Sequence, residues 1–259
     1  MSDLIQWPKA KWWTRDFNPV IGCHKVSPAC ANCWACEWAK RFKQSFDPHR
    51  STKKTPPKKG VVFAGGLTDL FGDWLSIEDS AGFISSAAIR NKETDATYIW
   101  LTKRVYRMCR ALDIIGRNAN LERWLGTHYF GFTAENQVWY DKRFRESRLL
   151  PDWANWWISA EPLLGPVDLG LSDRHPVTGA FGVIPHLPSW VVVGCESGSN
   201  RRPCKIEWVE SIVEQCLAVG VPVFVKQLSI GGKCETDINK FPAHLQIRQV
   251  PWAKEGGAK

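Results

Sequence analysis

The chain has 259 residues, which is enough for one large α/β domain, and its composition of 44% hydrophobic and 23% charged residues excludes a disordered chain. The absence of an apolar run of about 18 residues argues against a membrane protein. A net charge of +8 favours a polyanionic partner, with nucleic acid as the first candidate and simple solubility as the alternative.

The N-terminal sequence MSDLIQWPKAKWW lacks the apolar core and small-residue cleavage site of a secretory signal. We therefore expect a cytoplasmic protein. The nine cysteines are an odd number and are scattered apart from one early group, which is unlike the disulfide framework of a small secreted protein. Reduced thiols or metal ligands are the better expectation.

The early group is CHKVSPACANC, in which Cys23, Cys30 and Cys33 are spaced C-x6-C-x2-C directly before a helical pattern. Such a short loop can bring three thiolates to one metal centre. Zinc would need a fourth ligand, either Cys36 or His24, whereas an iron–sulfur cluster can leave one iron without a protein thiolate. Inert or disulfide-bonded cysteines are the third alternative. The spacing therefore predicts a metal without deciding which one.

Apolar runs alternate with amphipathic stretches along the rest of the chain, as in βα units around a parallel sheet. The simplest fold is one barrel-like α/β domain over residues 1–259. A helix is predicted over Lys205–Val219, with Ile206, Val209, Ile212, Val213, Cys216 and Leu217 on one face, and Ser76 is expected to cap another helix. The predicted strands are Val61–Ala64, Tyr98–Thr102, Tyr129–Thr133, Trp156–Ser159, Trp190–Val193 and Val223–Lys226.

Two segments interrupt this alternation. Residues 47–60, DPHRSTKKTPPKKG, contain prolines and several lysines, so we expect an exposed basic loop that can contact phosphates. Residues 165–188 are rich in glycine, proline and histidine and lie where a helix would normally connect two strands. This insertion is expected to be a loop that covers a site.

Polar residues follow directly after several of the predicted strands. Because the loops after the strands of such a barrel converge on one mouth, these side chains are expected to line a polar cavity. The alternative is that they form ion pairs that merely close the end of the barrel. The residues are Asp69, Thr102, Lys103, Glu135, Asn136, Glu161, Glu196 and Lys226.

Six motifs in order carry a resemblance to a known family: FNPVIGCHKVSPACANCWA, YIWLTKR, GFTAENQ, ISAEPLLGPVDL, VVVGCESG and VFVKQ. Together they span about residues 7–229, and they resemble the phage-associated three-cysteine-motif family, which is similar to radical S-adenosylmethionine (SAM) enzymes. The resemblance implies a partial or near-complete (β/α) barrel of the TIM-barrel type. It also implies that Cys23, Cys30 and Cys33 bind a [4Fe-4S] cluster whose fourth iron is left for SAM. The usual spacing is C-x3-C-x2-C, so the first gap is longer here.

The resemblance also suggests which residues bind SAM. Gly65 and Gly66 follow the strand that carries the glycine-rich motif of radical SAM enzymes, which faces the methionine ammonium. The usual GGE is absent, so Asp69 would supply the carboxylate. Glu135 falls where a polar residue contacts the ribose, and Glu161 is a further candidate for SAM binding. Lys103, Glu196 and Lys226 are candidate substrate contacts.

The implied activity is radical chemistry. The reduced cluster would give one electron to SAM, and the resulting 5′-deoxyadenosyl radical would abstract a hydrogen from the substrate. A reductant protein such as flavodoxin would be a partner, in the cytoplasm of the host cell. The expected substrate is a base of phage DNA, such as a hypermodified thymine, flipped out of the duplex. The alternatives are a zinc-stabilised nucleic-acid-binding module without catalysis, and a radical enzyme acting on a free small molecule or a partner protein.

Overall fold

The protein is a mixed α/β fold whose strands pair mostly in parallel. The computed structural model describes residues 6–52, 55–92, 94–171, 178–179, 182–183, 187–198 and 200–252. We call Trp13–Phe132 with Glu146–Asn155 the cysteine-loop unit, and Met1–Trp12 with Thr133–Arg145 and Trp156–Lys259 the C-terminal unit. The α/β prediction is confirmed, whereas closure of the strands into a barrel stays a prediction.

The sheet of the cysteine-loop unit is parallel, with strands in the order β1 (Arg15–Phe17), β4 (Val61–Ala64), β5 (Thr97–Thr102) and β6 (His128–Thr133). β4, β5 and β6 are buried along nearly their whole length, which is why each appears as an unbroken apolar run in the sequence. These three strands are confirmed. β1 was not predicted, because its short sequence RDF is mostly exposed and contains no apolar run.

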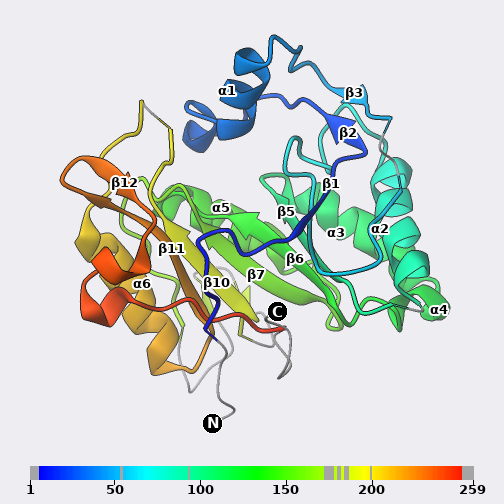
Figure 1. Ribbon diagram of the computed structural model, residues 1–259. Helices are drawn as coiled ribbons and strands as arrows, with labels where there is room; N and C mark the ends of the chain where they lie inside the picture. Colours follow the sequence, from blue (N-terminus) through cyan, green and yellow to red (C-terminus); the bar gives the residue numbers. More distant parts are fainter. Residues whose placement is uncertain are drawn as a thin grey trace. The chain divides into compact units, whose positions relative to one another are not determined.

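Helices α2 (Ile77–Asn91), α3 (Val105–Gly116) and α4 (Ala119–Glu122) belong to the same unit. α2 and α3 pack against each other, as Figure 1 shows. The Ser76 side chain accepts a hydrogen bond of 2.9 Å from the backbone N–H of Asp79, so the predicted cap of α2 is confirmed. None of the described helices is long and apolar enough to cross a membrane.

The cysteine-loop unit also contains α1 (Trp34–Arg41) and a short antiparallel pair, β2 (Val20–Ile21) and β3 (His49–Arg50). In Figure 1, α1 lies at the same end of the unit as this pair. Arg50, in the predicted basic loop, forms a 2.6 Å ion pair with Asp79 of α2. Lys58 and Lys59 are exposed, and Lys53 and Lys54 lie outside the described residues. Part of the positive charge of this loop therefore anchors it to the fold.

The C-terminal unit contains the parallel strands β7 (Asn155–Ala160), β10 (Trp190–Gly194) and β11 (Val223–Ile230), and β12 (Lys233–Glu235) pairs antiparallel with β11. The three predicted strands in this region are confirmed, and β11 is longer than expected. Gly231 and Gly232 form the turn between β11 and β12 with φ of +55° and +72°. A two-residue hairpin turn with both φ values positive favours glycine at both positions.

Helix α6 (Ile206–Ala218) lies against β10 and β11, and α5 (Gln137–Ser147) precedes β7 in the chain. The helix predicted over Lys205–Val219 is confirmed, and four of its expected inward residues are buried: Val209, Ile212, Val213 and Cys216. Leu217 is 49% exposed, so its placement on the buried face was wrong. It directly follows Cys216, one residue beyond the arc that faces the strands.

The predicted insertion at 165–188 is described only in part. β8 (Thr178–Gly179) and β9 (Gly182–Val183) pair antiparallel within it. Residues 172–177, 180–181 and 184–186 lie outside the described residues. A role for this insertion as a cover over a site therefore stays a prediction.

Several of the 15 tryptophans form the core of the C-terminal unit. Trp12, Trp157, Trp190 and Trp252 make one cluster, with ring centroids 5.3 Å apart for Trp12 and Trp190 and 4.7 Å apart for Trp190 and Trp252. Edge-to-face pairs of this kind stabilise a core beyond the apolar area that they bury. Packing in the core therefore accounts for this cluster of tryptophans. Trp34 on α1 differs, since it is 47% exposed.

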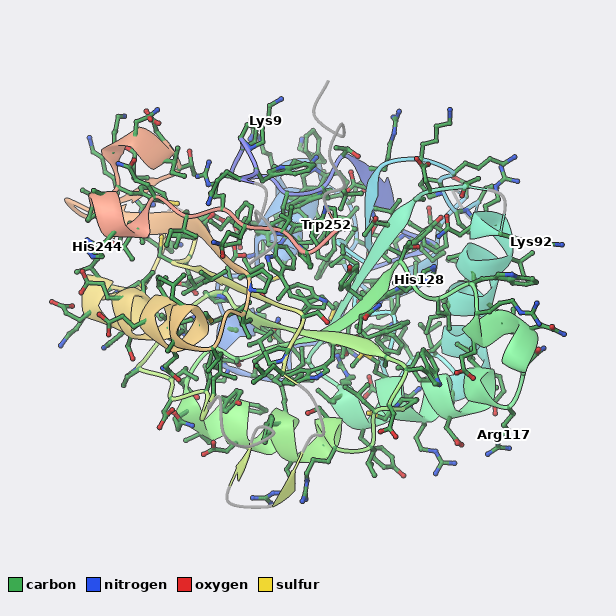
Figure 2. The ribbon with its side chains drawn as sticks, turned by 90° about the horizontal axis from the view of Figure 1, so that it is seen from below. Lys9, Lys92, Arg117, His128, His244 and Trp252 are labelled. Carbon is green, nitrogen blue, oxygen red and sulfur yellow. The ribbon has the colours of Figure 1, made fainter. Side chains whose placement is uncertain are left out.

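A fully buried histidine lies in the interior of the cysteine-loop unit. Figure 2 shows His128 among the strands, and it is 0% exposed at the start of β6. Its Nδ1 accepts a hydrogen bond of 3.2 Å from Nε1 of Trp100, and its ring stacks 4.8 Å from that of Tyr98. Burial lowers the pKa of His128 to about 3, so the ring is neutral in the fold.

We expect acid to destabilise the protein through His128. The pKa of a histidine in the unfolded chain is about 6.5, so below that pH the unfolded state binds a proton at His128. The folded state binds this proton only near pH 3. The free energy of unfolding should therefore fall by about 1.4 kcal/mol for each pH unit below 6.5. Urea unfolding at a series of pH values measures this slope.

The matched variants are His128→Gln, which does not titrate, and His244→Gln, which removes an exposed histidine (Figure 2). His128→Gln should flatten the pH dependence of unfolding by close to one proton, and it should do so more than His244→Gln does. Equal slopes for the wild type and His128→Gln would contradict this account.

Candidate metal centre

The segment between β2 and α1 carries the three predicted metal ligands. Cys30 ends the 3-10 helix η1 (Pro28–Cys30), and Cys33 is the N-cap residue of α1. Cys36 lies in the first turn of that helix. None of the cysteines is in a disulfide; Cys30 is buried, and Cys23, Cys33 and Cys36 are half-buried. The thiols thus lie on a short segment that is fixed at one end by β2 and at the other by α1.

The environments of Cys23 and Cys30 differ. Burial raises the pKa of Cys23 to about 12, and the nearby Asp69 carboxylate adds to this effect while Arg104 opposes it. Burial also acts to raise the pKa of Cys30, but the Lys103 ammonium and hydrogen bonds from Ser27 outweigh it, so that this pKa lies below its ordinary value. Cys30 is therefore the easier of the two to convert into the thiolate that binds a metal.

Asp69 is the centre of a hydrogen-bond network that joins the end of β4 to the end of β5. Its Oδ1 accepts hydrogen bonds from Oγ1 of Thr102 at 2.7 Å and from the N–H of Phe71 at 3.0 Å. Its Oδ2 accepts from the N–H of Lys103 at 3.1 Å and from Nη1 of Arg104 at 3.2 Å. Asp69 therefore fixes the Arg104 guanidinium and the backbone of Lys103, and its direct contact with SAM stays a prediction.

Arg104 is a site residue that the sequence analysis missed. Its Nη2 donates to the carbonyl of His24 at 3.3 Å, and its guanidinium lies 4.8 Å from the ring centroid of Trp74. It therefore fixes the cysteine loop to the start of α3. Its position next to Lys103, directly after a predicted strand, was the signal available. His24 itself lies against Trp74, at 4.9 Å between ring centroids, and its Nδ1 is 4.0 Å from Asp73.

The glycine turn after β4 is bonded to the beginning of the cysteine loop. Gly65 has φ of +80°, and a Cβ there would approach Cγ of Leu70 to 3.0 Å. In the same turn, Oγ1 of Thr68 donates to the carbonyl of Gly22 at 2.6 Å, and the N–H of Gly22 donates to the carbonyl of Leu67 at 3.0 Å. The turn predicted to face SAM and the loop predicted to bind the metal are therefore one connected structure.

Gly22 is the second residue that the sequence analysis missed. It has φ of +93°, and a Cβ there would lie 2.4 Å from the carbonyl oxygen of Asp47. No other amino acid satisfies both the backbone angle and this close approach. Gly22 thus sets the direction in which the chain enters Cys23. For Gly66 the constraint is milder, since a Cβ would lie 3.1 Å from Phe63.

The other predicted site residues belong to the C-terminal unit and are engaged in ion pairs there. Nζ of Lys226, in β11, lies 2.5 Å from Oε1 of Glu161, which also accepts a hydrogen bond of 3.1 Å from Nε2 of Gln227. Arg202 donates to Glu196 through its backbone and its guanidinium. Glu161 and Lys226 are each 19% exposed, so this pair is reachable from solvent.

Glu135 is in a different environment. Its side chain is completely buried and forms an ion pair with Arg143 of α5, which is itself 1% exposed. The predicted contact of Glu135 with the SAM ribose stays a prediction. Its observed role is to neutralise a buried guanidinium, which also donates to the carbonyl of Thr133 at 2.7 Å.

The chemistry of the donors fits an iron–sulfur cluster held by three thiolates. Among the described residues there is no group of three or more His, Cys, Asp or Glu side chains placed to hold one metal ion. A cluster attaches each cysteine to a separate iron, so its sulfurs need not surround one point as zinc ligands do. The Cys30 thiolate adds to the raised pKa of Cys23, and Lys103 lies near both cysteines, which would offset the negative charge of thiolates.

Comparison with known proteins gives one family. Residues 8–250 match the family DUF5131, described as a protein of unknown function. No curated protein and no solved structure matches the chain significantly.

Proposed function

The chain belongs to the DUF5131 family, and we propose that it is a radical SAM enzyme with a [4Fe-4S] cluster bound by Cys23, Cys30 and Cys33. When bound, the cluster would supply one electron to cleave SAM and start hydrogen abstraction from the substrate. The support from the fold is that the cysteine loop and the glycine turn after β4 are hydrogen-bonded to each other in one unit. This is the single observation on which the proposal rests most.

The residues around the loop have separable tasks in this proposal. Cys30, with its lowered pKa, would form its thiolate more readily than Cys23. Lys103 and Arg104 would balance the negative charge of the ligands, and Asp69 accepts hydrogen bonds from the backbone of Lys103 and the guanidinium of Arg104. Gly65 and Gly66 would let the methionine end of SAM approach the backbone. Cys36, one turn into α1, would not bind metal.

We further propose that the substrate is a base or a base-linked group of DNA, such as a hypermodified thymine. The net charge of +8 supports a polyanionic partner, and the exposed Trp34 directly follows Cys33, where it could stack on a base. Arg201 and Arg202 are already engaged by protein groups, Arg201 by the carbonyls of Gly198 and Gly232 and Arg202 by Glu196. Phosphate contacts would therefore come from other cations.

The direct test is anaerobic reconstitution of the full chain with iron and sulfide, followed by reduction and incubation with SAM. We expect iron and labile sulfide in equal amounts, a brown protein, and 5′-deoxyadenosine as a product. A colourless protein that retains zinc and leaves SAM intact would overturn the proposal in favour of a zinc-stabilised binding module.

The substrate class needs a separate measurement. DNA binding that weakens steeply with salt would support a nucleic-acid substrate, because released counterions dominate such binding. Cleavage of SAM without DNA binding at low salt would instead favour a free small molecule or a protein as the substrate.

A further inference from the structure

Helix α1 carries a line of aromatic side chains. Trp34 and Trp38 lie in α1 and Phe42 is its C-cap residue, so the three follow one another at intervals of four residues along one side of the helix. We infer that this aromatic face of α1, with Arg41 and Lys43 beside it, is a binding surface for an unpaired strand of DNA. The inference rests on the proposed function for the choice of DNA, and it names where the strand would lie.

The helix buries its small side chains and exposes its large ones. Ala35 and Ala39 are the buried residues of α1, and both have only a methyl group. Trp34 is 47% exposed and Phe42 is 55% exposed, whereas Trp38 is half-buried and its ring centroid lies 5.1 Å from that of Phe42. In Figure 1, α1 stands apart from α2 and α3 of the same unit. Large exposed aromatic groups in such a line indicate a surface that binds a partner.

Positive charge surrounds the aromatic face. Arg41 comes three residues after Trp38, and both Arg41 and Lys43 are exposed and have no ion pair among the residues that the structure describes. The only acidic residue within residues 24–46 is Glu37, which pairs with Lys40 at 2.7 Å. The cations in this segment are Lys25, Lys40, Arg41 and Lys43. The surface therefore fits a polyanion that also offers flat apolar groups.

Lys43 occupies a backbone position that favours glycine. Its φ is +53°, and α1 ends in a Schellman motif in which the N–H of Gln44 donates to the carbonyl of Ala39 at 2.9 Å and the N–H of Lys43 donates to that of Lys40 at 3.0 Å. Glycine or asparagine is usual at this position, because a side chain there costs free energy. A lysine that is kept in spite of this cost indicates a use for its charge.

An unpaired strand fits this surface better than a duplex does. In a duplex the faces of the bases are covered by their neighbours, whereas in a single strand they are free to stack on aromatic side chains. Trp34 and Phe42 would each take one base, and Arg41 and Lys43 would contact the phosphates of the same strand. Trp34 directly follows Cys33, so the strand would pass next to the proposed cluster.

The test uses the full chain and the fluorescence anisotropy of a labelled oligonucleotide, as a single strand and as a duplex of the same sequence. We expect tighter binding of the single strand. Trp34→Ala and Phe42→Ala should each weaken it at least about fivefold, because each loses one stacked base. Trp34→Phe should retain binding, and Trp34→Leu, which is apolar but has no ring, should not. Ile89→Ala is the matched control, since Ile89 is 57% exposed on α2.

Lys43→Gly separates binding from folding. It removes the cation but suits the backbone, so the urea midpoint of unfolding should not fall, while the slope of log affinity against log salt should decrease by up to about one. Lys59→Ala is the matched control. Lys59 is exposed and precedes β4, whereas the glycine turn bonded to the cysteine loop follows β4, so Lys59 lies at the other end of that strand. Its loss should leave the salt slope unchanged.

Wild-type affinity in Trp34→Ala, or an unchanged salt slope in Lys43→Gly, would overturn the inference. Self-association of the chain that Trp34→Ala abolishes, without binding of the single strand, would assign the aromatic face to a second copy instead. None of these measurements uses SAM. An enzyme that cleaves SAM but whose α1 variants bind DNA normally would lose only this inference. Weakened binding in the α1 variants of a protein that leaves SAM intact would instead support the binding surface and remove the radical chemistry.

Discussion

Replacing Cys30 with alanine is expected to abolish cluster binding and to reduce 5′-deoxyadenosine formation by more than about 100-fold. Mutating a residue that only hydrogen-bonds to a metal ligand already costs about 10–100-fold in metal affinity or activity, so loss of a ligand itself should cost more. Cys30 is the buried member of the predicted ligands, and Lys103 and Ser27 favour its thiolate. Its removal takes away a donor that is more readily deprotonated than Cys23. Iron and sulfide content after anaerobic reconstitution, and product formation from SAM, are the measurements.

Cys36→Ala is the matched control for this result. Cys36 lies in the same short region, in the first turn of α1, but the proposal gives it no metal bond. The variant should keep the iron content, the brown colour and the SAM cleavage of the wild type. A loss of metal in Cys36→Ala that equals the loss in Cys30→Ala would point to a four-ligand site and would contradict the three-thiolate cluster.

The second large effect concerns the buried ion pair of the C-terminal unit. Glu135→Gln is expected to reduce the free energy of unfolding by about 3–5 kcal/mol, because it leaves the guanidinium of Arg143 charged and buried without its carboxylate. Both side chains are almost completely inaccessible, so water cannot replace the lost partner. Chemical denaturation of the purified variant measures the change.

Two further variants locate the cause of this loss. Glu37→Gln removes one member of an exposed pair with Lys40, and it should change stability by less than about 0.5 kcal/mol. The double variant Glu135→Gln with Arg143→Met removes both buried charges and should recover part of the loss. If Glu135→Gln retained full stability but bound SAM more weakly, the ribose contact would be the better description of Glu135.

The sequence predicts which polar residues lie near strand ends, but not which residues they contact. A polar residue directly after an apolar run indicates the end of a buried strand, and Lys103 and Glu161 directly follow β5 and β7. The placement of Lys226 at a strand end was wrong, because β11 continues through it to Ile230, and Asp69 lies in the turn that follows β4. The structure pairs Glu161 with Lys226, which lie far apart in the sequence, and brings Asp69 to the backbone of Lys103. The rule finds such residues but not their partners, because pairing depends on which strands become neighbours in the sheet.

Arg104 and Gly22 illustrate what the sequence analysis missed. Arg104 is one of several arginines, and its importance comes from simultaneous contacts with Asp69, the carbonyl of His24 and the ring of Trp74. Gly22 is one of 20 glycines, and the carbonyl oxygen that excludes a side chain belongs to Asp47, which is distant in sequence. Neither constraint is local, so the sequence around each residue does not show which groups it contacts.

The sequence by itself determined the α/β class, the principal strands, the cap at Ser76, and the spacing of the three cysteines before α1. Each of these depends on near neighbours along the chain, through apolar periodicity, a side-chain cap, or a short gap between thiols. Only the tertiary structure decided which charges meet and that Lys103 lies beside Cys30. Those outcomes follow from strand order and register, which bring together residues that are remote in the sequence.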